Sequence, residues 1–509
     1  MEYIIGADIG TTSTKAVLYD QKGNVLEYAN VGYPLYQDEP DMAEQDVEEI
    51  FEAVVDAITQ VVRKSDVAAK DIRGVSFSSA MHSLILLNQE MEPITRSITW
   101  ADNRAAKYSE ELKTNGLGQK IYEKTGTPIH PMAPLSKLIW LKTEKPELFN
   151  QARYFIGIKE YVLYKFFGEL KMDQSIASAT GLFNIFDLTW DNLALETVGI
   201  TVDLLPEVVA TDYQFQGIKK SYAEVMGLPE DIKFVIGASD GVLSNLGVNA
   251  VDEGVLALTI GTSGAIRTVV DQPVTDPKGR LFCYVLSEGK YVLGGPVNNG
   301  GIVFRWVRDQ LFAPEKETAA QMKIDSYDIL TEMASTIPAG SDGLIFLPYL
   351  GGERAPLWDA NARGTYFGLN RNHTRAHMLR AALEGIVFNL YTVLLALEEV
   401  SGSPKSIQAT GGFARSALWR QMLADIFETD VTIPESFESS CLGAAVLGMV
   451  SLDMAKDLTV VKEMIGVTNA HHPNEKNYTA YRDLLPIFIR LSRQLSGEYK
   501  AIADYQRTH

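Results

Sequence analysis

The amino-acid sequence predicts an α/β protein made of two similar lobes, and three observations support this prediction. The chain has 509 residues, which exceeds the size at which a single hydrophobic core stops growing. A β-branched run that breaks at glycine, turns through small hydroxylic residues and resumes as a strand occurs twice, at 5–18 and at 258–266. After each copy, further strands and helices follow, so both antiparallel hairpins and strand–helix crossovers are expected.

The first half opens with short apolar runs separated by turn residues, which predict strands at 3–9, 14–19, 25–28, 72–77 and 83–87. Asp46 precedes a segment with helical spacing and has Glu49 three residues on, so a helix with a capping box is expected. One face of this helix is apolar and comprises Val47, Ile50, Phe51, Val54, Val55, Ile58, Val61 and Val62.

The second half repeats this plan, with strands expected at 255–260, 265–270, 282–286 and 291–293. A nearly all-apolar helix at 377–400 is expected to be buried on every side. A change of lobe is expected near 248–254, which gives domains at 1–248 and 249–509. The helix at 377–400 and the amphipathic end at 481–505 fit either a core or a subunit interface, so a homodimer is one candidate state.

The composition excludes several classes of partner. The net charge of −19 argues against nucleic acid and anionic membranes, because both need a basic surface. Anionic substrates would need a site where the negative electrostatic potential of the protein is locally reversed. A divalent metal and glycine-rich amide nests can supply the positive charge for this. The chain has only two cysteines, opens directly into a strand and has no stretch of about 18 apolar residues. A cytoplasmic protein is therefore expected.

The tips of the two hairpins, 10–13 and 261–264, carry glycine, threonine and serine. Such a tip offers backbone N–H groups and hydroxyls to a phosphate with no side-chain bulk in the way. Asp8 stands just before the first tip, where a carboxylate can hold Mg²⁺ or simply form a turn. Lys15 can reach a phosphate, although a solvated strand lysine fits equally well. Together the two tips indicate ATP chemistry.

Asp240 follows an apolar strand at 234–238, at the carboxyl edge where open α/β sheets bind their ligands. A carboxylate there could accept the proton of an alcohol that attacks a phosphoryl group. Taken alone, Asp240 fits a helix N-cap for a segment that starts at Gly241. Combined with Asp8 and the two hairpin tips, the catalytic interpretation is favoured.

Other segments carry further candidates. Two glycine-rich turns, 294–301 and 409–416, each lead into a helical pattern, which suits phosphate and a flat adenine ring. Either turn alone is explained by simple chain reversal. The segment 100–104 places Trp100 beside polar groups, which suits a polyol and equally a surface turn. The histidines include no His-Glu-x-x-His motif, so no metal site of that kind is expected.

With these residues in hand, the chain resembles the FGGY family of carbohydrate kinases from residue 1 to about 506. Residues 132–144 fit the first signature of this family, and residues 364–369 with 377–384 fit the second. Four further stretches, 78–83, 126–134, 157–161 and 294–301, resemble the branch of the family that acts on gluconate. The branch that acts on xylulose is a near neighbour and shares Met81 and His82.

The resemblance implies two ribonuclease H-like domains of the actin-like ATPase type, which close over a sugar and MgATP. It implies Asp240 as the base, with Asp8 and Asp240 near the metal. It places the nucleotide at Thr11, Thr12, Ser13, Lys15, Thr262, Gly301, Arg305, Gly412 and Ser416, to which the glycine turns add Gly261, Gly300 and Gly411. It places Met81 and His82 on the sugar, where glycerol kinases carry Arg-Glu.

The expected activity is ATP-dependent phosphorylation of D-gluconate to 6-phospho-D-gluconate. Trp100 and Asp102 are candidate sugar contacts, and the substrate carboxylate needs a cationic or donating partner, for which the candidates are His82, Arg104, Lys159 and Arg354. One alternative is a kinase for another sugar such as D-xylulose. An alternative of a different class is an actin- or chaperone-like ATPase without a sugar substrate, whose ATP hydrolysis no sugar would affect.

Overall fold

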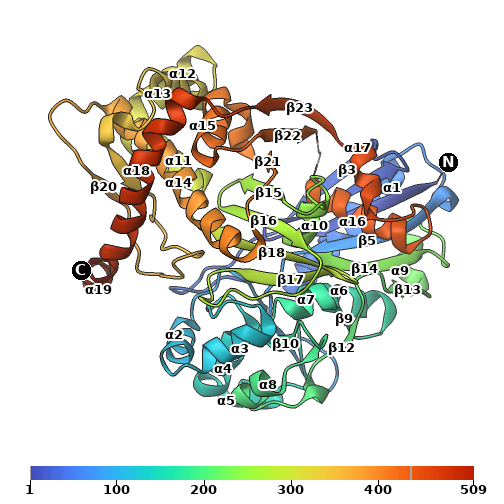
Figure 1. Ribbon diagram of the computed structural model, residues 1–509. Helices are drawn as coiled ribbons and strands as arrows, with labels where there is room; N and C mark the ends of the chain where they lie inside the picture. Colours follow the sequence, from blue (N-terminus) through green and yellow to red (C-terminus); the bar gives the residue numbers. More distant parts are fainter. Residues whose placement is uncertain (1, 436–437) are drawn as a thin grey trace. The chain divides into compact units, whose positions relative to one another are not determined.

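The computed structural model describes residues 2–435 and 438–509 (Figure 1). The described residues form two compact units. The first unit consists of the described residues of 1–252, 269–293 and 436–466, and the second consists of 253–268, 294–435 and 467–509. The chain therefore passes from one unit to the other several times, and residues near its C-terminal end complete the first unit.

The first unit is built on a six-stranded sheet with the order β13-β14-β5-β1-β2-β3. β1 pairs antiparallel with β2 and parallel with β5, and β14 pairs parallel with β5. Apolar β-branched runs separated by short polar turns form these strands, as expected. The strands are β1 (Tyr3–Ile9), β2 (Ser13–Asp20), β3 (Val25–Gly32), β5 (Ile72–Ser79), β13 (Gln214–Phe215) and β14 (Lys233–Ser239).

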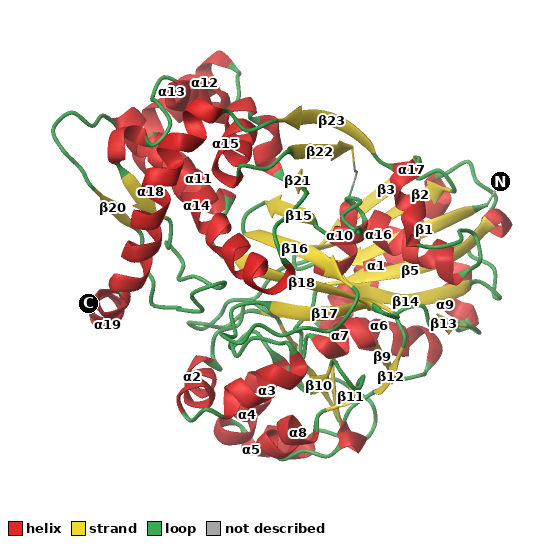
Figure 2. Cartoon of the chain, viewed as in Figure 1, coloured by secondary structure: helices red, strands yellow, loops and turns green. Residues whose placement is uncertain are grey.

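Helices cover both faces of this sheet (Figure 2), and successive residues of β1 point to opposite faces. Ile5 and Ala7 pack in one core with the helices α1 (Val47–Lys64), α6 (Ile158–Phe167) and α9 (Lys220–Met226). Ile4 packs in a second core with α10 (Asp240–Leu246) and α16 (Ser439–Ser451). Burial of both faces explains why the strand reads as a continuous apolar run.

A smaller helical region of the first unit has an apolar core of its own, which includes Leu84, Leu138 and Leu182. Its helices are α2 (Ala106–Thr114), α3 (Leu117–Thr125), α4 (Pro134–Glu144), α5 (Pro146–Gln151) and α8 (Asn192–Val198). Short elements connect it to the sheet, namely β6 (Ile85–Leu87), β7 (Ser97–Ile98), β8 (Tyr154–Ile156), β9 (Lys171–Asp173) and α7 (Gln174–Ser178). β17 (Phe282–Ser287) and β18 (Lys290–Val297) belong to the other large sheet, which has seven strands.

The second unit repeats the strand pattern of the first. β15 pairs antiparallel with β16 and parallel with β21, and β21 pairs parallel with β22. This is the arrangement of β2, β1, β5 and β14, so the repeat that the sequence predicts is confirmed. The strands are β15 (Val255–Ile260), β16 (Gly264–Val270), β21 (Ser406–Thr410), β22 (Val431–Glu435) and β23 (Gly466–His471). The main helices are α11 (Gly301–Trp306), α12 (Ala313–Met322), α13 (Ser326–Ser335), α14 (Arg375–Ser401), α15 (Ala417–Phe427), α18 (Glu475–Gln494) and α19 (Ser496–Thr508).

Three local expectations need correction. Asp46 caps α1 by accepting from Glu48 N and Glu49 N, but the Glu49 carboxylate accepts the Tyr36 hydroxyl at 2.9 Å instead of completing a capping box. α14 is buried all round only over 379–390 and has half-exposed positions beyond Tyr391. The amphipathic end is two helices, because α18 stops before Leu495 and α19 starts after it.

By length and composition, α14 is the one helix among the described residues that could cross a membrane, and 78% of its apolar window is buried inside the protein. Burial of that extent is what the core helix of a folded domain shows.

Candidate active site

Asp8 lies near the carboxyl end of β1, in the middle of the first unit's sheet. Its backbone pairs with Lys15 on one side and with Ser78 on the other. The Ser78 hydroxyl donates to Asp8 Oδ1 at 2.7 Å, and the side chain is 9% exposed. Burial raises the pKa of this carboxyl, the Ser78 hydrogen bond and the Lys15 charge oppose the rise, and the charge of Glu438 adds to it. An added cation would therefore stabilise the ionised form.

Lys15, on the neighbouring strand, forms an ion pair with Glu438. Lys15 Nζ lies 2.6 Å from Glu438 Oε2, and both side chains are about a quarter exposed. Burial alone would lower the pKa of Lys15, but the contact with Glu438 and the charge of Asp8 outweigh burial and raise it. The ammonium is thus charged and accessible beside the hairpin tip, next to Asp8.

Asp240 is the first residue of α10, directly after β14, and it is half-buried. Ser239 occupies the N-cap position without a side-chain capping hydrogen bond, so Asp240 is not the N-cap that the alternative interpretation expected. Asp240 Oδ1 accepts from Gly241 N at 2.6 Å. The register of β14 shifts between Val235 and Ala238, where Gly237 has φ +72° and an added Cβ would lie 1.7 Å from a backbone oxygen. Such a bulge redirects the end of a strand, and here it precedes Asp240.

Asp8 and Asp240 therefore belong to one edge of one sheet. Ser79 of β5 is level with Ile9 on one side and with Ser239 on the other. Two strand spacings separate β1 from β14, which is roughly 10 Å. The sheet therefore presents the two acids from strand ends on either side of β5.

Helix α16 holds these two ends together. An added Cβ on Gly443 would lie 2.0 Å from Leu243 O of α10, and one on Gly6 of β1 would lie 2.0 Å from Cys441 O. Backbones this close require glycine on one side of each contact. The Ser440 hydroxyl also donates to Asp240 O at 3.4 Å. The sequence analysis did not single out this helix, because its residues lie about 200 positions or more from those they contact.

Met81 and His82, the predicted sugar-contacting pair, follow β5 in a short loop. Met81 is partly exposed, whereas His82 is 7% exposed and adopts a left-handed φ of +69°. His82 Nδ1 lies 2.6 Å from Ala179 O. A carbonyl oxygen only accepts, so Nδ1 carries a hydrogen in this contact; when the ring is neutral, Nε2 is then an acceptor. Acceptors of this kind suit sugar hydroxyls.

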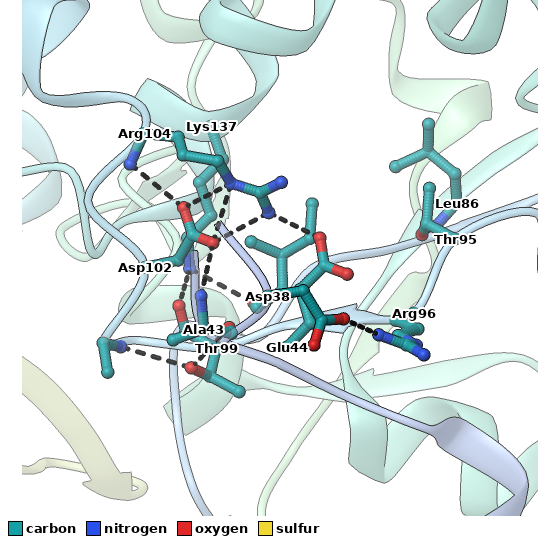
Figure 3. A network of polar contacts seen from close by, with 12 residues as sticks. Asp38, Ala43, Glu44, Leu86, Thr95, Arg96, Thr99, Asp102, Arg104 and Lys137 are labelled. Carbon is teal, nitrogen blue, oxygen red and sulfur yellow. Dashed lines mark hydrogen bonds and ion pairs between the residues drawn. The ribbon is translucent and has the colours of Figure 1, made fainter. Parts of the chain in front are cut away.

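The segment 100–104 is joined to the rest of the first unit by a dense polar network (Figure 3). Asp102 is fully buried and accepts from Ala43 N at 3.0 Å and from Arg104 Nε at 3.0 Å. Arg104 also contacts Glu44 Oε1 at 2.5 Å and lies over the Trp140 ring, 4.5 Å from its centroid. Asp102 therefore shapes the loop from within, and the Arg104 charge is balanced by two carboxylates.

Trp100 joins the predicted sugar segment to the predicted phosphate turn. Its Nε1 donates to Thr11 Oγ1 at 2.9 Å, while Gln45 Nε2 donates to Thr11 O at 2.6 Å. Thr12, at the tip itself, is exposed, and Ser13 is partly exposed. The tip thus keeps accessible hydroxyls while its base is anchored.

The two remaining cationic candidates belong to different units. Lys159 is 1% exposed; its Nζ lies 2.7 Å from Asp173 Oδ2 and donates to Ala238 O at 3.2 Å. It supports the strand end that precedes Asp240. Arg354 belongs to the second unit, where its Nη2 donates to Val297 O at 3.2 Å.

In the second unit, the predicted nucleotide segments converge on the tip of the β15–β16 hairpin. Gly261 N donates to Ser263 O at 2.9 Å, as Gly10 N donates to Ser13 O at 3.0 Å in the first unit. Gly301 N donates to Gly261 O at 2.7 Å, and Ile302 N donates to Thr262 O at 3.0 Å. The N-terminus of α11 is therefore fastened to the tip.

Glycine is required where these segments meet. An added Cβ would lie 2.5 Å from Ser263 O at Gly300 and 2.2 Å from Ile260 O at Gly411, whose φ is +111°. Gly412 is exposed, and an added Cβ there would meet nothing within 4 Å. A bare, open backbone of this kind suits the flat face of a base or a phosphate.

The two other predicted nucleotide contacts flank these turns. Arg305 is exposed on α11, one turn after Gly301. Ser416 caps α15, where its Oγ accepts from Trp419 N at 3.2 Å. The hydroxyl of Ser416 already serves as the cap of α15. Its contact with a nucleotide stays a prediction.

Three charged residues that contact predicted site segments escaped the sequence analysis. Glu438 pairs with Lys15. Glu353 is 1% exposed and accepts from Asn298 N at 2.5 Å and from Asn299 Nδ2 at 2.9 Å, so it holds the turn at 294–301. Lys137, from the first signature segment, is fully buried. Their distance along the chain from the residues they contact leaves no local pattern.

Metal binding by the protein alone has little support. Among the described residues there is no group of three or more His, Cys, Asp or Glu side chains that could hold a metal ion. A single carboxylate such as Asp8 fits Mg²⁺, which is often bound through one or two carboxylates, water and substrate phosphates. The donor set therefore fits a cation that is shared with a nucleotide.

The repeated sheet pattern, with an acid at the carboxyl edge and glycine-rich turns around each hairpin, defines an actin-like ATPase fold of two ribonuclease H-like domains. Comparison with known proteins narrows this class. Family models for the N-terminal and C-terminal domains of the FGGY family of carbohydrate kinases match residues 3–247 and 256–452. The chain belongs to the FGGY family of carbohydrate kinases, as the sequence predicts.

Full-length relatives are also known. The gluconokinase of Bacillus subtilis (strain 168) is 52% identical over 506 residues, covering 99% of this chain and 98% of the relative. The solved structure of a gluconate kinase from Lactobacillus acidophilus matches with a TM-score of 0.93 and 44% identity, covering 98% of this chain and 99% of that one. A ligand-bound xylulose kinase from the same organism matches with a TM-score of 0.94 and 44% identity, covering 99% and 100%.

Proposed function

We propose that this carbohydrate kinase transfers the γ-phosphoryl group of ATP to the terminal hydroxyl of D-gluconate. The observation that carries the choice of gluconate is the 52% identity to the Bacillus subtilis gluconokinase over nearly the whole of both chains. The arrangement of the site supports the chemistry. Asp8 and Asp240 belong to one sheet edge, and hydroxyl-acceptor groups such as the His82 ring lie in the loops beside it.

In the proposed reaction, Asp240 accepts the proton of the terminal hydroxyl as its oxygen attacks the γ-phosphorus. A new O–P bond forms, the bond from the γ-phosphorus to the bridging oxygen breaks, and ADP leaves with that oxygen. Lys15 exchanges Glu438 for a phosphate oxygen, and the amides of the hairpin tip donate to others. Preorganised donors of this kind stabilise the charge that is shared among the phosphates.

Mg²⁺ fits the site as a companion of the nucleotide. Asp8 would hold it, with Asp240 as the second candidate, and the ion would neutralise charge on the β- and γ-phosphates. Burial raises the pKa of Asp8. A bound cation would lower this pKa again and so favour the ionised carboxylate, as expected of a metal ligand.

The sugar is proposed to contact Met81, His82 and Trp100, with Arg104 of the adjoining segment as the cationic candidate for the gluconate carboxylate. Arg104 already faces Asp102 and Glu44, so it would contribute hydrogen bonds more than net charge. Lys159 is proposed to support the Asp240 strand end instead of touching the substrate, because its ammonium is committed to Asp173.

The test is a coupled assay of ADP release with gluconate, xylulose and glycerol measured side by side. We expect ADP release that depends on gluconate and yields a product phosphorylated at the terminal carbon. A clear preference for xylulose would favour the second candidate function, which the 44% identical xylulose kinase structure supports. ADP release that no sugar affects would overturn the kinase proposal in favour of a sugar-independent ATPase.

We also propose that the reaction takes place in the cytoplasm. Both cysteines, Cys283 and Cys441, are buried free thiols, which is compatible with a reducing compartment.

A further inference from the structure

Lys137 is a lysine in the interior of the protein with an unusual set of partners. It lies on α4 and is 0% exposed. Its Nζ donates to His82 O at 2.6 Å, to Thr99 O at 2.7 Å and to Ile98 O at 3.3 Å. An ammonium group has three N–H donors, so these carbonyls use all of them. Burial of a charge is costly unless it is paired and hydrogen-bonded, which makes an incidental placement improbable.

The three carbonyl groups belong to the two segments that carry the proposed sugar contacts. One of these carbonyls is that of His82, whose backbone has a left-handed φ of +69°. Residues other than glycine rarely adopt this conformation without support. Ile98 and Thr99 immediately precede Trp100. Lys137 is thus bonded to both segments at once, through atoms that substitution of their side chains would not remove.

Two charged side chains, Asp102 and Arg104, lie around Lys137 (Figure 3). Burial is the main cause that lowers the pKa of Lys137 to about 7; the Asp102 carboxylate opposes this fall, and the Arg104 charge adds to it. Trp140, one turn along α4, lies under the Arg104 guanidinium at 4.5 Å. One face of α4 therefore supports the segment 98–104 through Lys137 and through Trp140.

We propose that Lys137 is a positioning residue for the sugar, which holds the loop at His82 and the segment 98–104 in fixed register so that both contact one substrate molecule. The inference rests on the proposed function for the identity of the sugar. Lys137 does not touch the substrate in this assignment. Its effect passes through the backbone of the residues that do.

The consequence is a selective loss of sugar affinity. Without the ammonium, the two segments keep the backbone hydrogen bonds between Leu84 and Ile98, at 2.9 and 3.0 Å, but the carbonyls of His82 and Thr99 lose their shared donor. Small displacements of binding groups are expensive. The nucleotide turns at 261–264, 300–301 and 411–412 belong to the second unit, whereas Lys137 belongs to the first, and these turns are closed by hydrogen bonds of their own. The hairpin tip at 10–13 contacts Trp100 through Thr11, but Gln45 also holds Thr11 at 2.6 Å. ATP affinity is therefore expected to change little.

The decisive experiment compares Lys137→Met with Lys142→Met in the full-length protein. Lys142 lies on the same helix and donates to a backbone carbonyl, Val198 O at 2.7 Å, but that carbonyl ends α8, which carries no proposed contact. For Lys137→Met we expect the KM for gluconate to rise about 10- to 100-fold, with the KM for ATP within about threefold. Lys142→Met should leave both constants unchanged.

Three outcomes would overturn the assignment. Equal changes in both KM values would indicate a general structural role, and an unchanged KM for gluconate would show that the register does not depend on Lys137. If Lys137→Met does not fold, Lys137→Gln decides, because its amide keeps two donors for the three carbonyls; we expect the same selective change at smaller size. Failure of both variants to fold would also reject a positioning role in favour of a structural one.

The outcome is distinguishable from failure of the proposed function. If the unaltered protein phosphorylates xylulose and not gluconate, the choice of substrate is wrong while the role of Lys137 is measured with xylulose. If the unaltered protein uses gluconate and Lys137→Met binds it normally, the proposed function stands and the positioning role fails.

Discussion

At the scale of single residues, the proposed mechanism depends on a proton transfer to Asp240. Replacement by asparagine keeps the size of the side chain and removes the base, so we expect Asp240→Asn to lower turnover about 10²- to 10⁴-fold while ATP still binds. Steady-state ADP release and equilibrium ATP binding measure the two effects. Asp231→Asn, at an exposed position before β14, is the control, and near-native turnover of Asp240→Asn would remove Asp240 from its role.

Glu160 gives a residue-level prediction about stability and pH. Its side chain is fully buried, Oε2 accepts from Gly157 N at 2.8 Å, and Oε1 has no hydrogen-bond partner among the described residues. Burial raises the pKa of Glu160 from 4.5 to about 7, the Asp173 carboxylate adds to the rise, and Lys159 opposes it. The native state therefore holds a proton between pH 4.5 and 7 that the unfolded chain has lost.

The sign of the effect follows from that proton. Native Glu160 contributes stability that is full below pH 4.5 and is lost as pH rises through about 7. We therefore expect the free energy of unfolding of Glu160→Gln, relative to that of the unaltered protein, to be higher at pH 8 than at pH 5. Urea unfolding at the two pH values measures this difference. Glu147→Gln, at an exposed position, should show no such trend, and a parallel pH profile for Glu160→Gln would contradict the assignment.

Sequence reasoning at this scale found the acids but not their partners. Asp8 and Asp240 stand at the ends of apolar strands, a position that the local pattern reveals. Lys159 illustrates the opposite case. Its positive charge made it a candidate for the substrate carboxylate, yet Asp173, which binds it, lies outside any shared motif. Pairing between buried charges depends on tertiary packing, which no local pattern reports.

At the scale of elements, the crossing of α10 and α16 gives a prediction about the sheet edge that carries both acids. An added Cβ on Gly443 would lie 2.0 Å from Leu243 O, so Gly443→Ala must push the two helices apart. We expect a loss of about 1–3 kcal/mol in the free energy of unfolding and reduced turnover. Gly497→Ala, where an added Cβ meets nothing within 4 Å, should be neutral or slightly stabilising in the same denaturation experiment.

Element boundaries were predictable where apolar runs end at strong turn residues. The strands expected at 3–9 and 255–260 match β1 and β15, because glycine closes each run. β3 extends to Gly32, four residues beyond the expected end, because backbone pairing with β2 continues through these residues. The break between α18 and α19 at Leu495 was missed, since the amphipathic pattern continues across it.

At the scale of the whole molecule, the metal is expected to arrive with the nucleotide and not to hold the fold together. Chelation with EDTA should therefore abolish ADP release while leaving the melting temperature unchanged. Added Mg²⁺ should restore turnover. The described residues provide no cluster of three metal ligands, which is the physical reason for separating the two effects; a marked fall in melting temperature on chelation would point to a structural ion instead.

The repeat of the two hairpins was the property of the whole chain that the sequence disclosed most fully. It predicted the common strand pattern of both units, because strand pairing follows from short-range turns and apolar runs. The sequence did not disclose that residues 438–466 complete the first unit. That return depends on the fit of α16 against β1 and α10, a match of surfaces and not of motifs.

Because Asp8 and Asp240 inherit their spacing from the pairing of β1, β5 and β14, their mutual geometry is independent of the loops that carry Met81, His82 and Trp100. A protein engineer could exchange those loops to accept a different polyol without disturbing the two carboxylates that we propose to act in the reaction. Lys137 limits such redesign, because its ammonium donates to three backbone carbonyl oxygens. Any transplanted loop has to place carbonyl oxygens at the same positions.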